Sequence, residues 1–278
     1  MAKKEKLSKA KGGARWTVLG AGSILPRRGY GCSGYALEPT PGGPVTLFDC
    51  GPGTLRSMAE AGLELSALTR IVISHFHLDH CLDLFALGFA RTNPAFDAPP
   101  LELIGPVGLQ HYIEGAAAAL GNSPARGFLG VRFLEVEPSG KIASREFEDY
   151  KLSTVATYHT LQALAWRADL AGGGSVTYSG DTGEEPMVGT LAQKSGFFFC
   201  ECSFPEELGQ PNHLTPAGAG RLAAHADCAT LVLTHFYPSC DPERARVEAA
   251  KFFKGEILLA QDRSVFELAG DRTGEGCS

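Results

Sequence analysis

One short segment, SHFHLDHCLDL at residues 74–84, gathers side chains that commonly bind metal ions. Within six residues it holds His75, His77, Asp79 and His80. Imidazole and carboxylate groups are costly to bury unless they are paired or bound to a metal. The apolar runs on either side, RIVIS and CLDLFALGF, nevertheless indicate a buried setting. We therefore predict a metal site on a loop that leaves the end of a strand.

This segment cannot complete the site alone, because a catalytic zinc ion takes about three protein ligands and a water molecule. Further ligands must come from elsewhere in the chain, and three candidates each follow a β-rich run: His159, Asp181 and His235. The carboxylate of Asp181 could bridge two ions. We predict two sites with these ligand sets: His75, His77, His159 and Asp181 for one ion, and Asp79, His80, His235 and Asp181 for the other.

The elements that must position these side chains are short β-like runs separated by glycine and proline. Strands are expected at 16–20, 33–37, 44–50, 69–74, 101–105, 131–136, 151–158, 162–168, 175–180, 196–202, 230–236, 256–260 and 264–269. Helices are expected at 53–63, 81–93, 108–121, 215–227 and 241–253. Strands followed by helices, in a pattern that runs twice, predict two mixed sheets packed together with helices outside. The ligands would then gather on one rim of the sheets.

Composition and charge limit the class of protein. The chain has 278 residues, 44% hydrophobic and 20% charged, which is typical of a globular protein. No apolar run is long enough to cross a membrane, and the basic N-terminus lacks the apolar stretch of a secretory signal. We expect a cytoplasmic protein with a tail at 1–14, a single folded domain at 15–270 and a second tail at 271–278.

Four motifs in this order, HFHLDH, YHT, SGDT and LTHF, resemble those of the metallo-β-lactamase superfamily. The resemblance covers most of the chain, from residue 16 to residue 268. It implies an α/β fold, a four-layer αββα sandwich of two mixed β-sheets flanked by helices, with a di-metal site on one edge. Members with a cysteine ligand do not match, because SGDT places an aspartate at the bridging position.

Other segments resemble the ribonuclease Z-like branch of that superfamily. They are LGAGSILPRRGYGCSGYAL, FDCGPGTLRSM, IGPVGLQHYIEG and ECSFPEELGQPNHLTP. In that branch a further histidine lies near the scissile phosphate and is held by an acidic residue; the matching positions here are His213 and Glu201. Because family members are often dimers, we also expect a homodimer.

The resemblance departs from the family pattern at one point that bears on the substrate. Members of the branch that process tRNA carry a long arm between the histidine and the aspartate that correspond to His159 and Asp181 here. The chain between His159 and Asp181 has room for only one hairpin, with LAGGG at 170–174 as its turn. With a net charge of −6, this favours a small cyclic or nucleotide phosphodiester over tRNA and other nucleic acids. The alternatives are lactone or carboxylic ester hydrolysis, tRNA 3′-processing and a non-hydrolytic di-iron site.

The expected mechanism uses two divalent ions, about 3.5–4 Å apart, that share a hydroxide and offset charge on the phosphoryl group. His213 would protonate the leaving oxygen, with Glu201 orienting its ring. Asp79 would serve both as ligand and as proton acceptor. Zinc suits a histidine-rich site with carboxylates, and manganese or iron would suit it nearly as well.

Several smaller features keep two interpretations each. Asp49 either hydrogen-bonds a ligand histidine or caps a turn. Arg27 and Arg28 either meet a substrate phosphate or are solvated loop charges. The basic tail is either free or a weak contact for phosphate or nucleic acid. The eight cysteines are expected as buried thiols, with a disulfide or a cysteine–metal site as the alternative. His111 and His225 are expected to be structural or exposed.

Overall fold

The computed structural model describes residues 13–121 and 123–268, so the expected tails lie almost entirely outside the described residues. The expected boundary at residue 14 falls where the first strand begins. Within the described residues no helix has the length and apolar character needed to span a bilayer.

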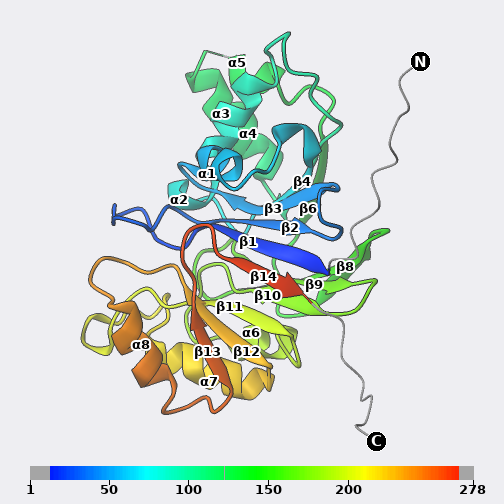
Figure 1. Ribbon diagram of the computed structural model, residues 1–278. Helices are drawn as coiled ribbons and strands as arrows, with labels where there is room; N and C mark the ends of the chain where they lie inside the picture. Colours follow the sequence, from blue (N-terminus) through cyan, green and yellow to red (C-terminus); the bar gives the residue numbers. More distant parts are fainter. Residues whose placement is uncertain (1–12, 122, 269–278) are drawn as a thin grey trace, which may run out of the picture.

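Two seven-stranded mixed sheets form the centre of the molecule (Figure 1). The first has the order β14 (Val265–Leu268), β1 (Ala14–Gly20), β2 (Gly34–Glu38), β3 (Val45–Cys50), β4 (Leu68–Val72), β5 (Glu102–Pro106) and β6 (Arg132–Val136). The second has the order β13 (Glu256–Leu259), β12 (Thr230–Thr234), β11 (Phe197–Glu201), β10 (Ser175–Tyr178), β9 (Leu164–Leu170), β8 (Tyr150–Ala156) and β7 (Ala143–Glu146).

Helices cover the outer face of each sheet. The first sheet carries α1 (Thr54–Glu60), α2 (Leu78–Cys81), α3 (Asp83–Ala90), α4 (Leu109–Ala119) and α5 (Ser123–Arg126). The second carries α6 (Pro186–Leu191), α7 (Pro216–Ala226) and α8 (Pro242–Ala249), and short 3-10 turns lie at Leu65–Ala67 and Glu206–Leu208. The four layers confirm the expected αββα sandwich.

Burial of aromatic side chains holds the two sheets together. Trp16, Tyr35 and Phe48 from the first sheet pack with Trp166 and Phe199 from the second, and all five are almost completely buried. Separate apolar clusters lie between each sheet and its own helices. Apolar burial on both faces explains why the strands read as nearly continuous hydrophobic runs.

Every strand expected from the sequence overlaps a strand of the structure, whereas the helices differ in detail. The helix expected at 81–93 begins at Leu78 instead and divides into α2 and α3, so Asp79 and His80 lie on a helical turn rather than before it. β7 was not expected because its four residues are all exposed and show no alternation. α6 was also missed, although Glu185 caps it and Pro186 begins it, which are ordinary start signals.

One edge of the sandwich collects the ends of the strands that matter for function. β3 runs parallel to β4, and β10, β11 and β12 are mutually parallel, so their carboxyl ends meet at a common edge. Two glycines permit the close approach of the loops there. A Cβ at Gly51 would lie 2.0 Å from the carbonyl oxygen of Asp79, and a Cβ at Gly180 would lie 2.9 Å from Cβ of Ser74. Any side chain at these positions would displace the segments that carry the site.

Candidate metal centre

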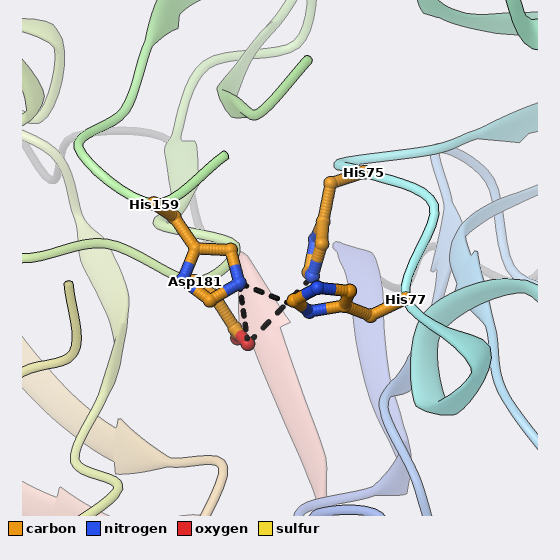
Figure 2. A group of neighbouring side chains, drawn as sticks. All are labelled: His75, His77, His159 and Asp181. Carbon is orange, nitrogen blue, oxygen red and sulfur yellow. Dashed lines mark hydrogen bonds and ion pairs between the residues drawn. The ribbon is translucent and has the colours of Figure 1, made fainter. Parts of the chain in front are cut away.

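The seven side chains expected as ligands come together at this edge. The first group contains His75, His77, His159 and Asp181, with candidate ligand atoms that all lie within 4.8 Å of one another (Figure 2). His159 Nε2 lies 3.0 Å from His77 Nδ1 and 3.7 Å from Asp181 Oδ2. His75 Nε2 lies 3.8 Å from the same carboxylate oxygen. These distances leave room for one ion between the four side chains.

The second group contains Asp79, His80 and His235, all buried. His235 Nε2 lies 3.3 Å from His80 Nε2 and 3.4 Å from Asp79 Oδ2. His235 adopts a left-handed backbone conformation, with φ at 57°. This conformation is uncommon for a residue other than glycine and is associated with functional sites.

Asp181 lies between the two groups and presents one oxygen to each. Oδ2 faces His75 and His159, while Oδ1 lies 3.4 Å from His80 Nε2 and 3.5 Å from His235 Nε2. Asp181 Oδ1 and His75 Nε2 are buried and make no hydrogen bond within the described residues. Buried polar atoms are rarely left unpaired, so the residues present fit two divalent ions that share this carboxylate.

The charges of the site are strongly coupled. Burial, followed by the neighbouring His80, lowers the pKa of His75 well below its usual value. Burial also acts to lower the pKa of His80, but the carboxylates of Asp181 and Asp49 outweigh it and raise that pKa well above the usual range. Burial tends to raise the pKa of Asp79, yet its hydrogen bond to His235 lowers the pKa to about 2. The carboxylates therefore stay ionised and favour cations.

Asp49 was expected either to hydrogen-bond a ligand histidine or to cap a turn. The structure shows that it hydrogen-bonds a candidate ligand. His80 Nδ1–H donates to Asp49 Oδ2 at 2.7 Å, and the Tyr178 hydroxyl donates to the same oxygen at 2.7 Å. The backbone N–H and hydroxyl of Ser74 donate to Asp49 at 2.7 and 2.8 Å. Ser74 Oγ also lies 3.0 Å from His75 Nδ1. The fully buried Asp49 thus orients His80 directly and His75 through Ser74.

Glu201 plays the corresponding part on the other side of the site. His213 Nδ1 lies 3.1 Å from Glu201 Oε1, and the backbone N–H groups of Thr182 and Leu214 also donate to this carboxylate. Ser203 donates a short hydrogen bond to Glu201, and its hydroxyl lies 3.0 Å from His235 Nδ1. The Glu201 carboxylate thus reaches His213 directly and His235 through Ser203.

His213 is the expected proton donor, and it lies at the mouth of the site. Its Nδ1 is 3.9 Å from Asp181 Oδ2, so it also falls within reach of Asp181 and His235 as a third group of ligand-type side chains. Burial tends to lower its pKa, but the hydrogen bond to Glu201 outweighs burial and raises it. Its side chain is 12% exposed, which leaves part of the ring open to a bound molecule.

The sequence interpretation missed Ser74 and Ser203, which connect the carboxylates to the histidines. The available signal was their position at strand ends, directly before His75 and two residues after Glu201. Arg27 does not extend toward the site, because its guanidinium donates to the Cys240 carbonyl at 3.0 Å and lies over the Tyr30 ring. Arg28 is exposed.

The remaining histidines and the cysteines behave as expected. His111 and His225 are exposed and lie outside the groups of ligand-type side chains. The described cysteines are free thiols, and they are mostly buried; Cys277 lies outside the described residues.

Comparison with known proteins agrees with this geometry. The family model described as "Beta-lactamase superfamily domain" matches residues 46–236. A ribonuclease Z of Nocardia farcinica is 30% identical, and the match covers 88% of this chain and 94% of that protein. The fold is similar to that of YhfI, a metallo-β-lactamase fold protein from Bacillus subtilis, with a TM-score of 0.77, 22% identity and coverage of 91% and 99% of the two chains.

The short form of human tRNase Z has a similar fold, with a TM-score of 0.70, 22% identity and coverage of 91% of this chain and 99% of that one. The family model spans more than half of the chain, and its match includes the first histidine segment, Asp181 and His235. The ligand-type clusters in the structure are those of a divalent-metal site. The chain is therefore a metal-dependent hydrolase that belongs to the metallo-β-lactamase superfamily, in its ribonuclease Z-like branch.

Proposed function

We propose that the protein hydrolyses a phosphodiester bond in a small cyclic or nucleotide-like molecule. The observation that carries this proposal is the placement of Asp181 between two groups of ligand-type side chains, with one oxygen toward each. His75, His77 and His159 would hold one divalent ion with Asp181, and the buried trio would hold the other: Asp79, His80 and His235. When bound, two such ions supply water that is activated near neutral pH and offset negative charge on phosphoryl oxygens.

The chain's own residues would handle the protons. The Nδ1 atom of His213 faces Glu201, which leaves Nε2 free to donate a proton to the leaving oxygen. Glu201 is fully buried and accepts several hydrogen bonds, so it can hold the ring in one orientation. Asp79 Oδ2 accepts from the Ile24 backbone N–H at 3.0 Å. Its other oxygen is left to accept a proton from the attacking water.

Two observations favour a small substrate over tRNA. Between His159 and Asp181 the chain forms only the β9–β10 hairpin, with no further protruding element in that stretch. Two exposed arginines on the second-sheet half are paired with acidic side chains, Arg221 with Glu184 and Arg244 with Glu207. RNA binding needs cations that are free to neutralise backbone phosphates. The resemblance to ribonuclease Z and the similar fold of human tRNase Z keep tRNA 3′-processing as the second candidate.

A substrate panel tests the proposal. Protein loaded separately with zinc, manganese or iron would be assayed on bis(4-nitrophenyl) phosphate, a nucleoside 2′,3′-cyclic phosphate, a lactone and a precursor tRNA. We expect phosphodiester turnover, greatest with zinc, that falls by more than about a hundredfold in His77→Ala. The exposed His111→Ala serves as the matched control and should keep wild-type rates. Equal rates in wild type and His77→Ala would refute the proposal, and turnover of precursor tRNA or lactone alone would replace it.

Location in the cytoplasm, assembly as a homodimer and the one-domain division at 15–270 stay predictions. Sedimentation of the purified chain, with and without added zinc, tests the dimer directly.

A further inference from the structure

Two aromatic side chains stand beside the metal centre and have no part in the function proposed above. The rings of Phe204 and Tyr237 stack with centroids 4.6 Å apart and planes at 27°. Phe204 lies 5.5 Å from the His213 ring, and Tyr237 lies 5.7 Å from the His235 ring and 6.2 Å from that of His213. We call Phe204 and Tyr237 the aromatic wall.

The loops that follow β11 and β12 hold the aromatic wall in place. Phe204 follows Ser203 directly, and Tyr237 comes two residues after His235. The backbone N–H of Tyr237 donates to the Ser203 carbonyl at 3.4 Å, which joins the two loops. Both aromatic residues are partly exposed. The wall is therefore fixed relative to His213 and His235 while part of its surface is open to solvent.

The hydroxyl of Tyr237 makes no hydrogen bond within the described part of the chain. A phenol is neutral at physiological pH, so the Tyr237 ring is an uncharged surface beside charged ligands.

Exposed apolar side chains also lie next to ligand residues in other loops. Leu78, between His77 and Asp79, is 51% exposed, and Tyr158, next to His159, is 58% exposed. Ile24, whose N–H donates to Asp79, is 46% exposed. Exposed apolar side chains beside a polar site can contact the organic part of a bound molecule. The surroundings of the metal centre thus suit an organic group better than a chain of phosphates.

We propose that the aromatic wall binds a planar aromatic ring attached to the phosphate that is cleaved. This inference rests on the proposed phosphodiester hydrolysis and names the substrate class: esters that carry an aryl group or a nucleobase. The wall adjoins His213, so the ring belongs to the leaving group that His213 protonates. Stacking on an aromatic side chain tolerates many ring types, so an aryl group and a nucleobase share this chemistry.

Direct binding tests the inference without relying on turnover. Calorimetric titrations of metal-loaded protein would use phenyl phosphate, adenosine 5′-monophosphate and methyl phosphate. We expect the two ring-bearing ligands to bind wild type about tenfold more tightly than methyl phosphate. Phe204→Leu and Tyr237→Leu should lose this preference while their affinity for methyl phosphate stays unchanged. The matched control, Phe89→Leu, removes an exposed ring on α3 and should keep the preference.

Further variants and ligands separate the ring from the hydroxyl and an aryl group from a nucleobase. Tyr237→Phe keeps the ring and should keep the preference; its loss in Tyr237→Phe would assign the effect to the hydroxyl and overturn stacking. A preference for phenyl phosphate alone would identify a directly esterified aryl group, and a preference for the nucleotide alone would identify a base; either supports the wall. Metal content and melting temperature would be checked for each variant.

Two outcomes overturn the inference: no ring preference in wild type, or the same preference in the leucine variants. The proposed phosphodiester hydrolysis can be refuted independently of the aromatic wall. Metal-loaded wild type that shows ring preference but no turnover of any phosphodiester would retain the aromatic wall and reject the hydrolysis.

Discussion

Two buried carboxylates support the metal centre, Asp49 on one side (the first half) and Glu201 on the other (the second half). Both halves use the same kinds of side chain in different ways. In the first half, Asp49 orients His80 directly and His75 through Ser74. In the second half, Glu201 orients His213 directly and reaches His235 only through Ser203. Each half thus combines a buried carboxylate, a serine and two histidines.

The difference lies in which histidine the carboxylate contacts. Asp49 contacts a fully buried candidate ligand, whereas Glu201 contacts the partly exposed ring of His213. A carboxylate behind a ligand strengthens and fixes metal binding, and a carboxylate behind a proton donor fixes its tautomer. The comparison therefore assigns metal retention to the first half and proton transfer to the second.

The largest expected effect comes from Asp49→Ala. This change leaves His80, Ser74 and the Tyr178 hydroxyl without their shared acceptor in a fully buried place. Unfolding free energy of the metal-free protein should fall by about 3–5 kcal/mol, measured by urea denaturation. The exposed Asp97→Ala is the control and should change stability little. If Asp49→Ala were as stable as wild type, the structural role assigned to Asp49 would be refuted.

His213→Ala sharpens the comparison from the other half. We expect turnover of a phosphodiester with a poor leaving group to fall by about a hundredfold or more. Bound metal, measured by elemental analysis after gel filtration, should stay at the wild-type level. A variant that loses both metal and turnover would show that His213 is a ligand, in the third group with Asp181 and His235.

The paired changes Ser74→Ala and Ser203→Ala compare the two connecting hydroxyls. Each should weaken metal binding by about tenfold, measured by competition with a chelating dye. Ser203→Ala should also lower turnover of the fully loaded protein, because Ser203 supports Glu201 behind His213. Ser74→Ala should not, once metal is saturating. Identical behaviour of the two variants would contradict the division of roles.

Tyr178→Phe has the smallest expected effect. It removes one of the hydrogen bonds to Asp49 and should lower unfolding free energy by about 1 kcal/mol. Tyr150→Phe is the matched control, because it removes a buried hydrogen bond to Thr46, and neither residue adjoins a ligand. Both variants should lose similar stability, and only Tyr178→Phe should weaken metal binding.

The ligand-type residues could be predicted from the sequence, whereas most of the residues that orient them could not. The ligand-type residues stand out in the sequence because histidine and aspartate are unusual between apolar runs and follow strands whose ends meet at one edge. Asp49 was left between two roles, since a strand-end aspartate can equally cap a turn. Ser74 and Ser203 gave no comparable signal, because serine is common at strand ends. β7 was missed because its four residues are all exposed, and α6 was missed because it has only 6 residues.

The amino-acid sequence alone determined the strands, the layered architecture and the side chains that can bind divalent metal. Periodic burial and residue chemistry are local properties, so a single chain reveals them. Only the tertiary structure decided that Asp181 turns one oxygen to each group, that Ser203 joins Glu201 to His235, and that Phe204 stacks on Tyr237 beside His213. Such contacts depend on directions and on distances of a few ångströms between loops far apart in the chain, and the packing of the two sheets sets them.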